Sequence, residues 1–366
     1  MNDLSMPDKP TKATNTTKKE NLVIGDVEIL PGQRHRIELP VGDLYTQAPL
    51  TMPIEVISGR RDGPVLFVSA AIHGDEINGV EIVRRLLRLP ALDKIRGTLI
   101  TVPVVNVQGF LNLSRYLPDR RDLNRSFPGS ERGSVAGRLA WLFAQEIVSK
   151  ADCGIDLHTA AIHRTNLPQI RADLSDEQTA KLANAFGTPV VIDSDLRDGS
   201  LREYAASQGI PMLLYEAGEA LRFDEQSIRA GVRGITNILR ELGMLPARKP
   251  SSNTKTSRKI TPIVARSSYW MRAERSGVLR PLAALGEKVS RDQVLGKISD
   301  PFGHGELEIC ARYAGIVIGR TQLPLVNEGD AIFHIARFES SMRAEQTVER
   351  FHEHIDSVNT EIPPIV

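Results

Sequence analysis

The sequence predicts an α/β fold with a mixed sheet flanked by helices, followed by a smaller all-β, barrel-like domain. Through the middle of the chain, short apolar runs alternate with segments of helical periodicity, which is typical of alternating strands and helices. A basic stretch rich in Pro and Ser, residues 246–261, interrupts this pattern and is typical of a linker. Beyond it, short β-type runs separated by glycines replace the helical periods.

The start of the chain predicts a tail and then a β extension. Residues 1–20 are polar and rich in Lys, Thr, Asn and Pro, so we expect them to be disordered. Residues 22–60 carry short alternating runs with Pro and Gly between them, which predicts antiparallel strands. These strands lead into the main domain, for which the expected bounds are 21–245.

The segment 64–87 organises this domain. Its apolar run, 65–72, fits a strand buried on both faces, and apolar residues at helical spacing follow it. The solvent-exposed side of this helix is predicted to carry Arg84, Arg85 and Arg88. Between strand and helix lies the tetrapeptide HGDE, with His73 and Glu76 at the strand's carboxyl end, where open α/β sheets bind their ligands. Taken alone, a polar turn is an equally good interpretation of this tetrapeptide.

The rest of the domain continues the alternation. Residues 106–129 have few periodic apolar positions and are dense in Arg, Asn and aromatic residues, which indicates a long functional loop. The elements expected around this loop are a strand at 99–105, a helix at 135–148, strands at 154–159 and 188–193, a helix at 201–208, a strand at 210–215 and a helix at 222–242.

Three predicted strands end at residues that suit a metal site. His73 and Glu76 follow the first, His158 ends another, and Glu216 follows a third. If these strands run parallel, the side chains share one edge of the sheet. Two His and one Glu are typical ligands of catalytic zinc, which keeps a further position for water. Taken alone, His158 is more typical of an ordinary core or surface histidine than of a metal ligand.

Three further carboxylates belong to this prediction. Asp156 lies two residues before His158, so on a strand it shares the same face and could orient the imidazole, although a structural role fits equally well. Metal-assisted hydrolysis also needs a general base near the attacking water. Glu216 is the candidate, and Glu219, expected on the following loop or helix start, is its competitor.

The long loop carries a second group of polar residues, Arg115 and the segment DLNR at 122–125. The planar guanidinium of Arg pairs with a carboxylate through two hydrogen bonds. Several such groups in a site imply an anionic substrate or the stabilisation of a developing oxyanion. A solvated basic loop, balanced by Asp119 and Asp122, is the alternative.

Five motifs in this order, HGDE, SRY, RDLNRSFPG, DLHT and YEAGE, resemble the succinylglutamate desuccinylase/aspartoacylase family of the zinc carboxypeptidase-like superfamily. The resemblance covers roughly residues 50–245 and extends into the β unit. It implies that His73, Glu76 and His158 bind one zinc ion per chain. It also implies that Glu216 activates the water and passes its proton to the leaving amine.

The same resemblance assigns roles to the long loop. It implies that Asn124 and Arg125 bind the carboxylate of the substrate, and that Arg115 stabilises the oxyanion. Between Arg115 and Asn124 the chain is slightly longer than aspartoacylase itself.

Residues 262–340 are expected to form the small all-β unit. They resemble the biotinyl/lipoyl barrel of bacterial family members, whose carrier forms bear a modified lysine on a hairpin tip. The corresponding tip here, 300–303, has the sequence DPFG and no lysine, so we expect a structural role, either covering the cleft or in an oligomer contact. Residues 341–366 are expected to form a C-terminal tail with a short charged helix before a Pro-containing end.

Composition bears on partners and location. The 366 residues include 46 basic and 45 acidic side chains, a formal net charge of +1, so neither a nucleic-acid partner nor a membrane surface is expected. Two distant cysteines provide no disulfide framework. No run approaches the ~18 apolar residues of a membrane span, and the N-terminus lacks a secretory signal, so we expect a cytoplasmic protein. Homo-oligomerisation stays open.

The sequence therefore predicts a zinc-dependent hydrolase that cleaves the amide bond of a small, anionic N-acyl amino acid. Two alternatives stay open: a zinc carboxypeptidase that acts on short peptides, and a non-catalytic ligand-binding relative. An open cleft would favour the carboxypeptidase, whereas a barrel and loops that close over the zinc would favour the deacylase. N-succinyl, N-acetyl and acetylated diamino acid substrates are all compatible with the sequence.

Overall fold

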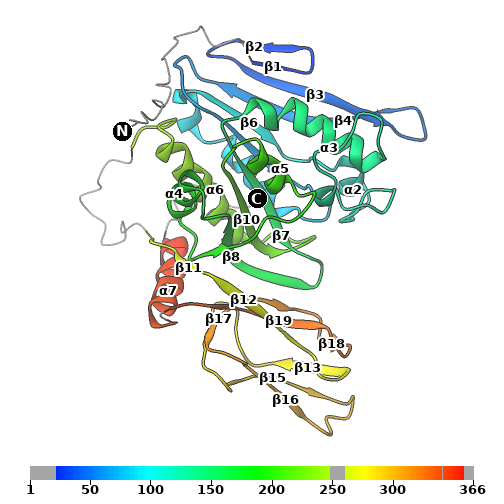
Figure 1. Cartoon of the computed structure of the whole chain (residues 1–366), viewed down its shortest axis with the longest axis vertical. Helices are drawn as coiled ribbons and strands as arrows, with labels where there is room; N and C mark the ends of the chain where they lie inside the picture. The colour runs from blue at the N-terminus through cyan, green and yellow to red at the C-terminus, as the bar shows by residue number, and fades with distance from the viewer. Residues whose placement is uncertain (1–21, 248–259, 340, 358–366) are drawn as a thin grey trace, which may run out of the picture.

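The computed structural model describes residues 22–247, 260–339 and 341–357. The expected disordered tail, most of the expected linker and the last residues of the expected C-terminal tail lie outside the described residues. Figure 1 shows a larger α/β domain and, below it, a smaller domain made mainly of strands. The predicted mixed sheet with flanking helices is confirmed.

The strands of the larger domain are β1 (Leu22–Ile24), β2 (Val27–Ile29), β3 (Arg34–Asp43), β4 (Pro49–Ser58), β5 (Val65–Ala70), β6 (Thr98–Val102), β7 (Cys153–Ala160), β8 (Arg164–Ala172), β9 (Val190–Asp193) and β10 (Met212–Glu219). Its helices are α1 (Asn78–Leu86), α2 (Val107–Leu111), α3 (Val135–Glu146), α4 (Glu177–Phe186), α5 (Leu201–Ser207) and α6 (Glu225–Glu241), with 3-10 helices η1 (Pro90–Lys94), η2 (Leu123–Arg125) and η3 (Val148–Lys150).

The smaller domain follows in the sequence. Its strands are β11 (Ile263–Ala265), β12 (Ser267–Arg272), β13 (Gly277–Pro281), β14 (Lys288–Val289), β15 (Val294–Ser299), β16 (Leu307–Cys310), β17 (Gly315–Thr321), β18 (Leu325–Val326) and β19 (Ala331–Arg337). The helix α7 (Ser341–Ser357) comes last. No described helix has both the length and the hydropathy of a membrane-spanning segment.

One mixed sheet runs through both domains. Its main path has the strand order β12-β19-β17-β8-β10-β7-β5-β6-β4-β3. The central strands β6, β5, β7 and β10 pair in parallel, whereas β3, β4 and β8 pair antiparallel with their neighbours on this path. Because β5, β7 and β10 run in the same direction, their carboxyl ends share one edge, which is the condition for the predicted site.

Helices cover both faces of the larger domain's sheet and enclose two cores. On one face α1, α4 and α6 pack with residues such as Ile82, Leu182 and Ile235. On the other face α3 and α5 pack with residues such as Phe143 and Leu201. Every residue of β5 and β7 is buried as a result, in agreement with the predicted strand between two layers of helices.

Three predictions about this domain need correction. The strand β8 and the helix α4 were not predicted, because the polar residues and proline of RTNLPQIRA disguise β8. The long loop at 106–129 is not wholly irregular, since it contains α2 and η2. Arg85 does not lie on the solvent side of α1: it is 2% exposed and forms ion pairs with Glu81 and Glu225.

The smaller domain has two layers of strands around its own core. The strands β12, β19, β17 and β14 extend the large sheet, and β16, β15, β13 and β18 form a separate sheet. Core residues such as Leu279, Val317 and Phe333 lie between the two layers. The tip between β15 and β16 is closed by a hydrogen bond from Gly303 N–H to the Asp300 carbonyl at 3.0 Å. This is the tip that the sequence predicts, and it has no lysine.

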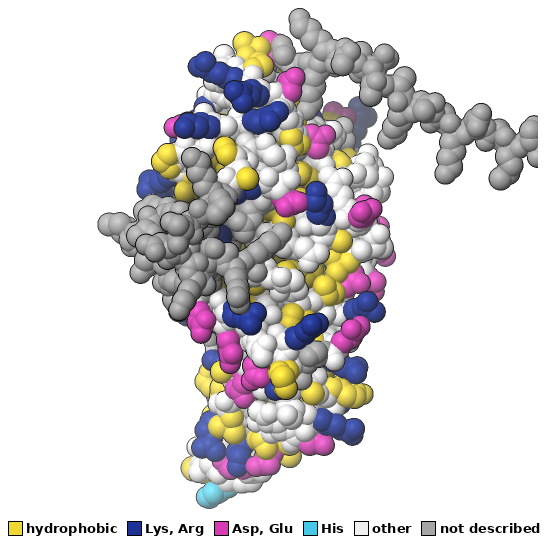
Figure 2. Space-filling view, turned by 90° about the vertical axis from the view of Figure 1, so that its left-hand side faces the viewer, with side chains coloured by type: hydrophobic (Ala, Val, Ile, Leu, Met, Phe, Trp, Pro, Cys, Tyr) yellow, Lys and Arg dark blue, Asp and Glu magenta, His cyan; other side chains and the backbone are white. Residues whose placement is uncertain are grey.

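The two domains are joined by strand pairing. The strand β17 pairs antiparallel with β8, and β11 pairs parallel with β9. Buried residues of both domains, including Leu167, Ile192 and Ile318, share one further core, against which α7 packs. On the face shown in Figure 2, basic and acidic side chains are interspersed, in keeping with the near-zero net charge.

Candidate functional site

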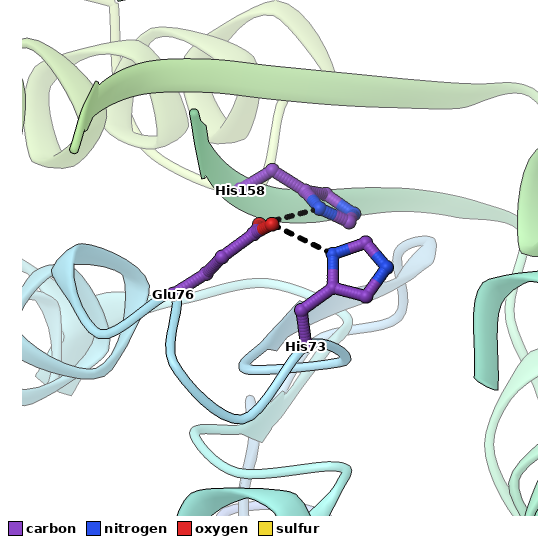
Figure 3. Close-up of side chains that lie close together, drawn as sticks. All are labelled: His73, Glu76 and His158. Carbon is purple, nitrogen blue, oxygen red and sulfur yellow. Dashed lines mark hydrogen bonds and ion pairs between the residues drawn. The ribbon is translucent and has the colours of Figure 1, made fainter. Parts of the chain in front are cut away.

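Three buried side chains meet at the carboxyl edge of the sheet: His73, Glu76 and His158 (Figure 3). One ligand atom from each residue lies within 4.8 Å of the other two. The carboxylate of Glu76 reaches the two imidazole rings, whose centroids are 4.9 Å apart. Within the described ranges, this is the one group of three or more such residues with a geometry that can hold a metal ion.

The turn that presents His73 and Glu76 depends on the glycine between them. The backbone N–H of Glu76 donates to the His73 carbonyl at 3.1 Å and closes the turn after β5. A Cβ on Gly74 would lie 1.9 Å from the backbone carbonyl carbon of Gly109. Any side chain at position 74 would therefore collide with α2, so glycine is needed here.

Each imidazole nitrogen of the cluster lies against a carboxylate oxygen. His73 Nδ1 is 2.8 Å from Glu76 Oε1, and its Nε2 is 3.1 Å from Asp122 Oδ1. His158 Nδ1 is 2.8 Å from Glu76 Oε2, and its Nε2 is 2.7 Å from Asp156 Oδ2. Asp156 thus contacts the imidazole whose face it was expected to share.

Burial and these carboxylates act in opposite directions on the pKa values of the cluster. Burial lowers the pKa of His73, but the charge of Glu76 and the hydrogen bonds with Asp122 and Glu76 raise it, and the net shift is upward. Burial also lowers the pKa of His158, yet Asp156 and Glu76 raise it well above 6.5. Burial raises the pKa of Glu76, but the two imidazoles outweigh it and hold that pKa far below the usual range.

The donor set fits a zinc ion. Two imidazoles and one carboxylate are typical ligands of catalytic zinc. The Nδ1 atoms of both rings face Glu76, while the Nε2 atoms face Asp122 and Asp156. A carboxylate on the second nitrogen orients a histidine ligand and increases its basicity. The residues present therefore suit the metal that the family resemblance implies.

The predicted site residues line one cleft of about 630 Å³. They are His73, Glu76, Arg115, Asn124, Arg125, His158 and Glu216. The smaller domain contributes Ser267, Ser268 and Trp270 of β12 to the same cleft. Its volume lies within the range of small-molecule sites.

Glu216 lies directly beside His158 in the register of β10 and β7. The register of β10 shifts after Glu216 toward both neighbouring strands, and such irregularities often re-aim a side chain next to an active site. Glu216 Oε2 accepts a hydrogen bond from Asn166 Nδ2 at 2.6 Å, and Oε1 lies 3.3 Å from Arg171 Nε. The carboxylate is therefore held at both oxygens.

Glu219, the competing candidate for the general base, has a different environment. Its Oε1 accepts a hydrogen bond from the backbone N–H of His163 at 3.1 Å, and Oε2 lies 3.6 Å from Arg222 Nε. It is not among the residues that line the cleft. The geometry therefore favours Glu216 as the base.

Arg115 lies next to the candidate metal centre. Its Nη1 is 3.2 Å from Glu76 Oε1, and its Nη2 is 2.9 Å from Asp122 Oδ2. The guanidinium thus reaches the cluster from the long loop, at a position suited to an oxygen that gains negative charge there.

Asn124 and Arg125 lie on η2, which begins where the Asp122 side chain accepts the N–H of Asn124 at 2.9 Å. Asn124 Oδ1 accepts a hydrogen bond from the backbone N–H of Leu201 at 2.9 Å. This contact fixes the orientation of the amide, so that Nδ2 is the atom that can donate to a ligand. The Arg125 side chain is exposed and lines the cleft, and its backbone packs on Gly199, where a Cβ would lie 2.6 Å from the Arg125 carbonyl oxygen.

The cleft residues that the sequence prediction missed include Asn166, Arg171, Arg197 and Arg202. Burial and neighbouring arginines lower the pKa of Arg197, and the same causes lower that of Arg202 to about 10. The cleft therefore concentrates positive charge close to Glu216. No motif marks these residues, and two of them lie on β8, the strand that the sequence did not reveal.

The fold and the cleft define the class of protein: an α/β protein with a His-Glu-His candidate metal centre and a nearby carboxylate at the carboxyl ends of parallel strands. Residues 62–242 match the model of the succinylglutamate desuccinylase/aspartoacylase catalytic domain. The chain belongs to this family of deacylases, as its motifs predicted.

Similar proteins cover nearly the same length. An N-alpha-acetyl-L-2,4-diaminobutyric acid deacetylase from Halomonas elongata is 27% identical over 317 residues, which are 84% of this chain and 92% of the relative. A succinylglutamate desuccinylase/aspartoacylase structure from Rhodobacter sphaeroides has a TM-score of 0.73 and 26% identity, covering 83% of this chain and 96% of that one. A product-bound ectoine utilization protein from Ruegeria pomeroyi has a TM-score of 0.71 and 25% identity, covering 83% and 95%.

Proposed function

We propose that the chain is a zinc-dependent hydrolase that cleaves the amide bond of a small, anionic N-acyl amino acid. His73, Glu76 and His158 would hold one zinc ion. The observation that carries the proposal is the position of Glu216, which lies beside His158 and lines the same cleft as the three ligands. Membership of a deacylase family supports the same reaction.

The residues of the cleft have different roles in amide hydrolysis. Bound zinc acidifies water and polarises a carbonyl oxygen. Glu216 accepts the proton of the attacking water and transfers it to the nitrogen of the leaving amine. Arg115 donates to the carbonyl oxygen as this atom gains negative charge.

Arg125 and Asn124 bind the α-carboxylate of the substrate. The guanidinium of Arg125 can donate two parallel hydrogen bonds to a carboxylate. The amide nitrogen of Asn124 supplies a further donor, because its oxygen is already bound to Leu201. Both residues sit on η2 in the cleft that holds the candidate metal centre, so a carboxylate there lies close to the scissile amide.

The wall that the smaller domain adds to the cleft supports a deacylase rather than a carboxypeptidase. Ser267, Ser268 and Trp270 of the smaller domain form this wall.

Two kinds of acyl group are supported by different observations. The Halomonas relative is named as a deacetylase of N-alpha-acetyl-L-2,4-diaminobutyric acid, which supports an N-acetyl substrate. Three further arginines line the cleft, Arg171, Arg197 and Arg202, and they support a second negative charge on the substrate, as in an N-succinyl group.

A panel of substrates that differ in one group tests the proposal. N-acetyl and N-succinyl amino acids should release free amine, and the best of them should react faster than any longer peptide. Amidation of its α-carboxylate should lower kcat/KM of the wild type roughly ten- to a hundredfold, because charged hydrogen bonds contribute ~1.5–3 kcal/mol. The same amidation should change kcat/KM of the Arg125→Ala variant little. Arg125→Lys should also lower kcat/KM for the acid, because Lys keeps the charge but lacks the planar guanidinium that donates two parallel hydrogen bonds.

Two outcomes of this panel would contradict the proposal. Equal hydrolysis of the acid and the amide by the wild type would exclude recognition of the carboxylate. Faster cleavage of a longer peptide than of every N-acyl amino acid would assign the chain to the carboxypeptidases instead.

A further inference from the structure

The strand β8 lies between the candidate active site and the smaller domain. One of its edges pairs with β10, which carries Glu216, and the other pairs with β17. Figure 1 shows β8 in this position, at the lower end of the larger domain. A residue on β8 can therefore contact the site on one side and the smaller domain on the other.

Asn166 of β8 makes both contacts. Its Nδ2 donates to Glu216 Oε2 at 2.6 Å, the shorter of the two polar contacts of that carboxylate. The backbone of Asn166 pairs in register with Gly319 on β17. The residue before this glycine, Ile318, is buried in the core that the two domains share. Asn166 therefore connects the carboxylate of Glu216 to a fixed part of the domain boundary.

Because Gly319 has no side chain, the space beside it can be occupied by the side chain of Asn166. A Cβ at position 319 would lie 2.7 Å from Asn166 Oδ1, closer than real Cβ contacts come, and 3.4 Å from both His334 Cβ and the Thr165 carbonyl oxygen. The register between β17 and β19 shifts between Val317 and Gly319, so the strand is irregular at this point. A side chain at 319 would push the Asn166 amide away from its present position.

We infer that Asn166 is a positioning residue for Glu216, and that Gly319 of the smaller domain keeps it in place. The inference rests on the proposed function, because it takes Glu216 as the general base. The Asn166 hydrogen bond holds one carboxylate oxygen and so limits rotation of the group that must meet the water and then the leaving amine. Misplacement of a reacting group by about 1 Å can cost about a hundredfold in rate.

The smaller domain thereby contributes to the reaction. It acts on Glu216 through one pair of residues across the β8–β17 pairing, in addition to the wall that β12 adds to the cleft. The contact requires no lysine and no carrier chemistry, in keeping with the DPFG tip.

The first experiment replaces Asn166 with Ala, which removes the donor, or with Asp, which has the same shape but replaces the N–H donor with a carboxylate that repels the charge of Glu216. In full-length, metal-loaded protein, Asn166→Asp and Asn166→Ala should lower kcat about tenfold or more, with KM changed less than about twofold. Metal content should equal that of the wild type. Asn166→Gln, which keeps the amide donor on a longer side chain, should recover part of the kcat lost in Asn166→Ala. An unchanged kcat in both Asn166→Asp and Asn166→Ala would overturn the inference.

The second experiment is a double-mutant cycle across the domain boundary. Gly319→Ala should lower kcat several-fold in the wild type, yet change kcat less than about twofold in the Asn166→Ala background, where the colliding amide is gone. Gly296→Ala is the matched control: its Cβ would lie 3.0 Å from the Arg280 carbonyl oxygen, on a strand of the separate sheet. This control should leave kcat unchanged. Equal, additive losses in both backgrounds would overturn the role of Gly319.

A structural measurement separates this inference from the proposed function. If the wild type released no amine from any substrate, the proposed function would fail, but the crystal structure of Gly319→Ala would still test the contact. The expected result is an Asn166 Nδ2 to Glu216 Oε2 distance beyond hydrogen-bond range. A distance that stays at 2.6 Å would overturn the inference, whatever the activity.

Discussion

Four carboxylate oxygens surround the two imidazole rings of the candidate metal centre. They belong to Glu76, which supplies two, and to Asp122 and Asp156. In the absence of a metal, this arrangement keeps protons on His73 and His158, because the carboxylates outweigh burial and raise both pKa values. A metal that binds through Nδ1 must displace those protons.

Metal binding at neutral pH should therefore release protons, up to about two per ion. The sign follows from the direction of the pKa shifts: in the folded, metal-free protein both histidines keep their protons to a higher pH than a free imidazole does, and lose them only as the pH rises through the raised pKa values. Zinc affinity should accordingly fall as the pH is lowered. Titration calorimetry in two buffers of different ionisation enthalpy measures the number released, and a heat independent of buffer would contradict this prediction.

The assignment of the base makes a second prediction at this scale. Glu216→Gln should retain zinc and the fold but lose kcat by about a hundredfold or more, because the amide cannot accept the proton. Glu219→Gln is the matched control on the same strand and should keep kcat within about twofold of the wild type. Steady-state kinetics with metal analysis of each protein checks both. A loss confined to KM in Glu216→Gln would rule it out as the base.

The residues whose location the sequence predicted stand in short motifs at strand ends. His73, Glu76, His158 and Glu216 all follow apolar runs, and the parallel strands bring them to one edge. Asn166 could not be found in this way. Its strand is antiparallel and polar, and its role depends on a glycine far away in the sequence.

At the scale of elements, Arg85 shows how a charged residue can be misassigned. The sequence prediction placed Arg84, Arg85 and Arg88 on one side of a helix, but Arg88 lies beyond the end of α1, and α6 packs against Arg85. Arg85 donates to Glu81 on its own helix at 2.8 Å and to both carboxylate oxygens of Glu225 on α6, at 2.9 and 2.7 Å. The sequence shows the spacing of the arginines but not the neighbouring helix.

Arg85→Ala should therefore lower the free energy of unfolding by roughly 3 kcal/mol, because it removes one partner of a buried ion pair and leaves Glu81 inside. Arg84→Ala is the control: Arg84 also pairs with Glu81, but about half of its side chain is exposed, and its effect should be much smaller. Urea denaturation measures both. Equal effects of the two substitutions would contradict the burial argument.

At the scale of the whole molecule, the boundary between the domains is a continuous sheet. The linker-like stretch in the sequence separates two expected domains, yet β8 pairs with β17, β9 pairs with β11, and one core includes residues of both domains. Pairing between strands so distant in the sequence leaves no local pattern. This explains why most of the elements could be predicted while the connection between the domains could not.

The shared sheet and core predict that the two domains unfold together. Calorimetry should show one transition in which the calorimetric and van't Hoff enthalpies agree. Separation of the β domain would expose the edge of β8 and the apolar residues of the shared core, which favours a single cooperative unit. Two resolved transitions, one of them unaffected by substitutions in the larger domain, would contradict this prediction.

The central claim, a zinc-dependent amide hydrolase, is tested most directly by amine release from an N-acyl amino acid before and after removal of the metal. The purified chain should contain about one zinc ion, lose activity on chelation, and recover it when zinc is restored. A His73→Ala, His158→Ala double variant should neither bind zinc nor recover activity. Amine release that survives chelation, or normal zinc content in the double variant, would contradict the account.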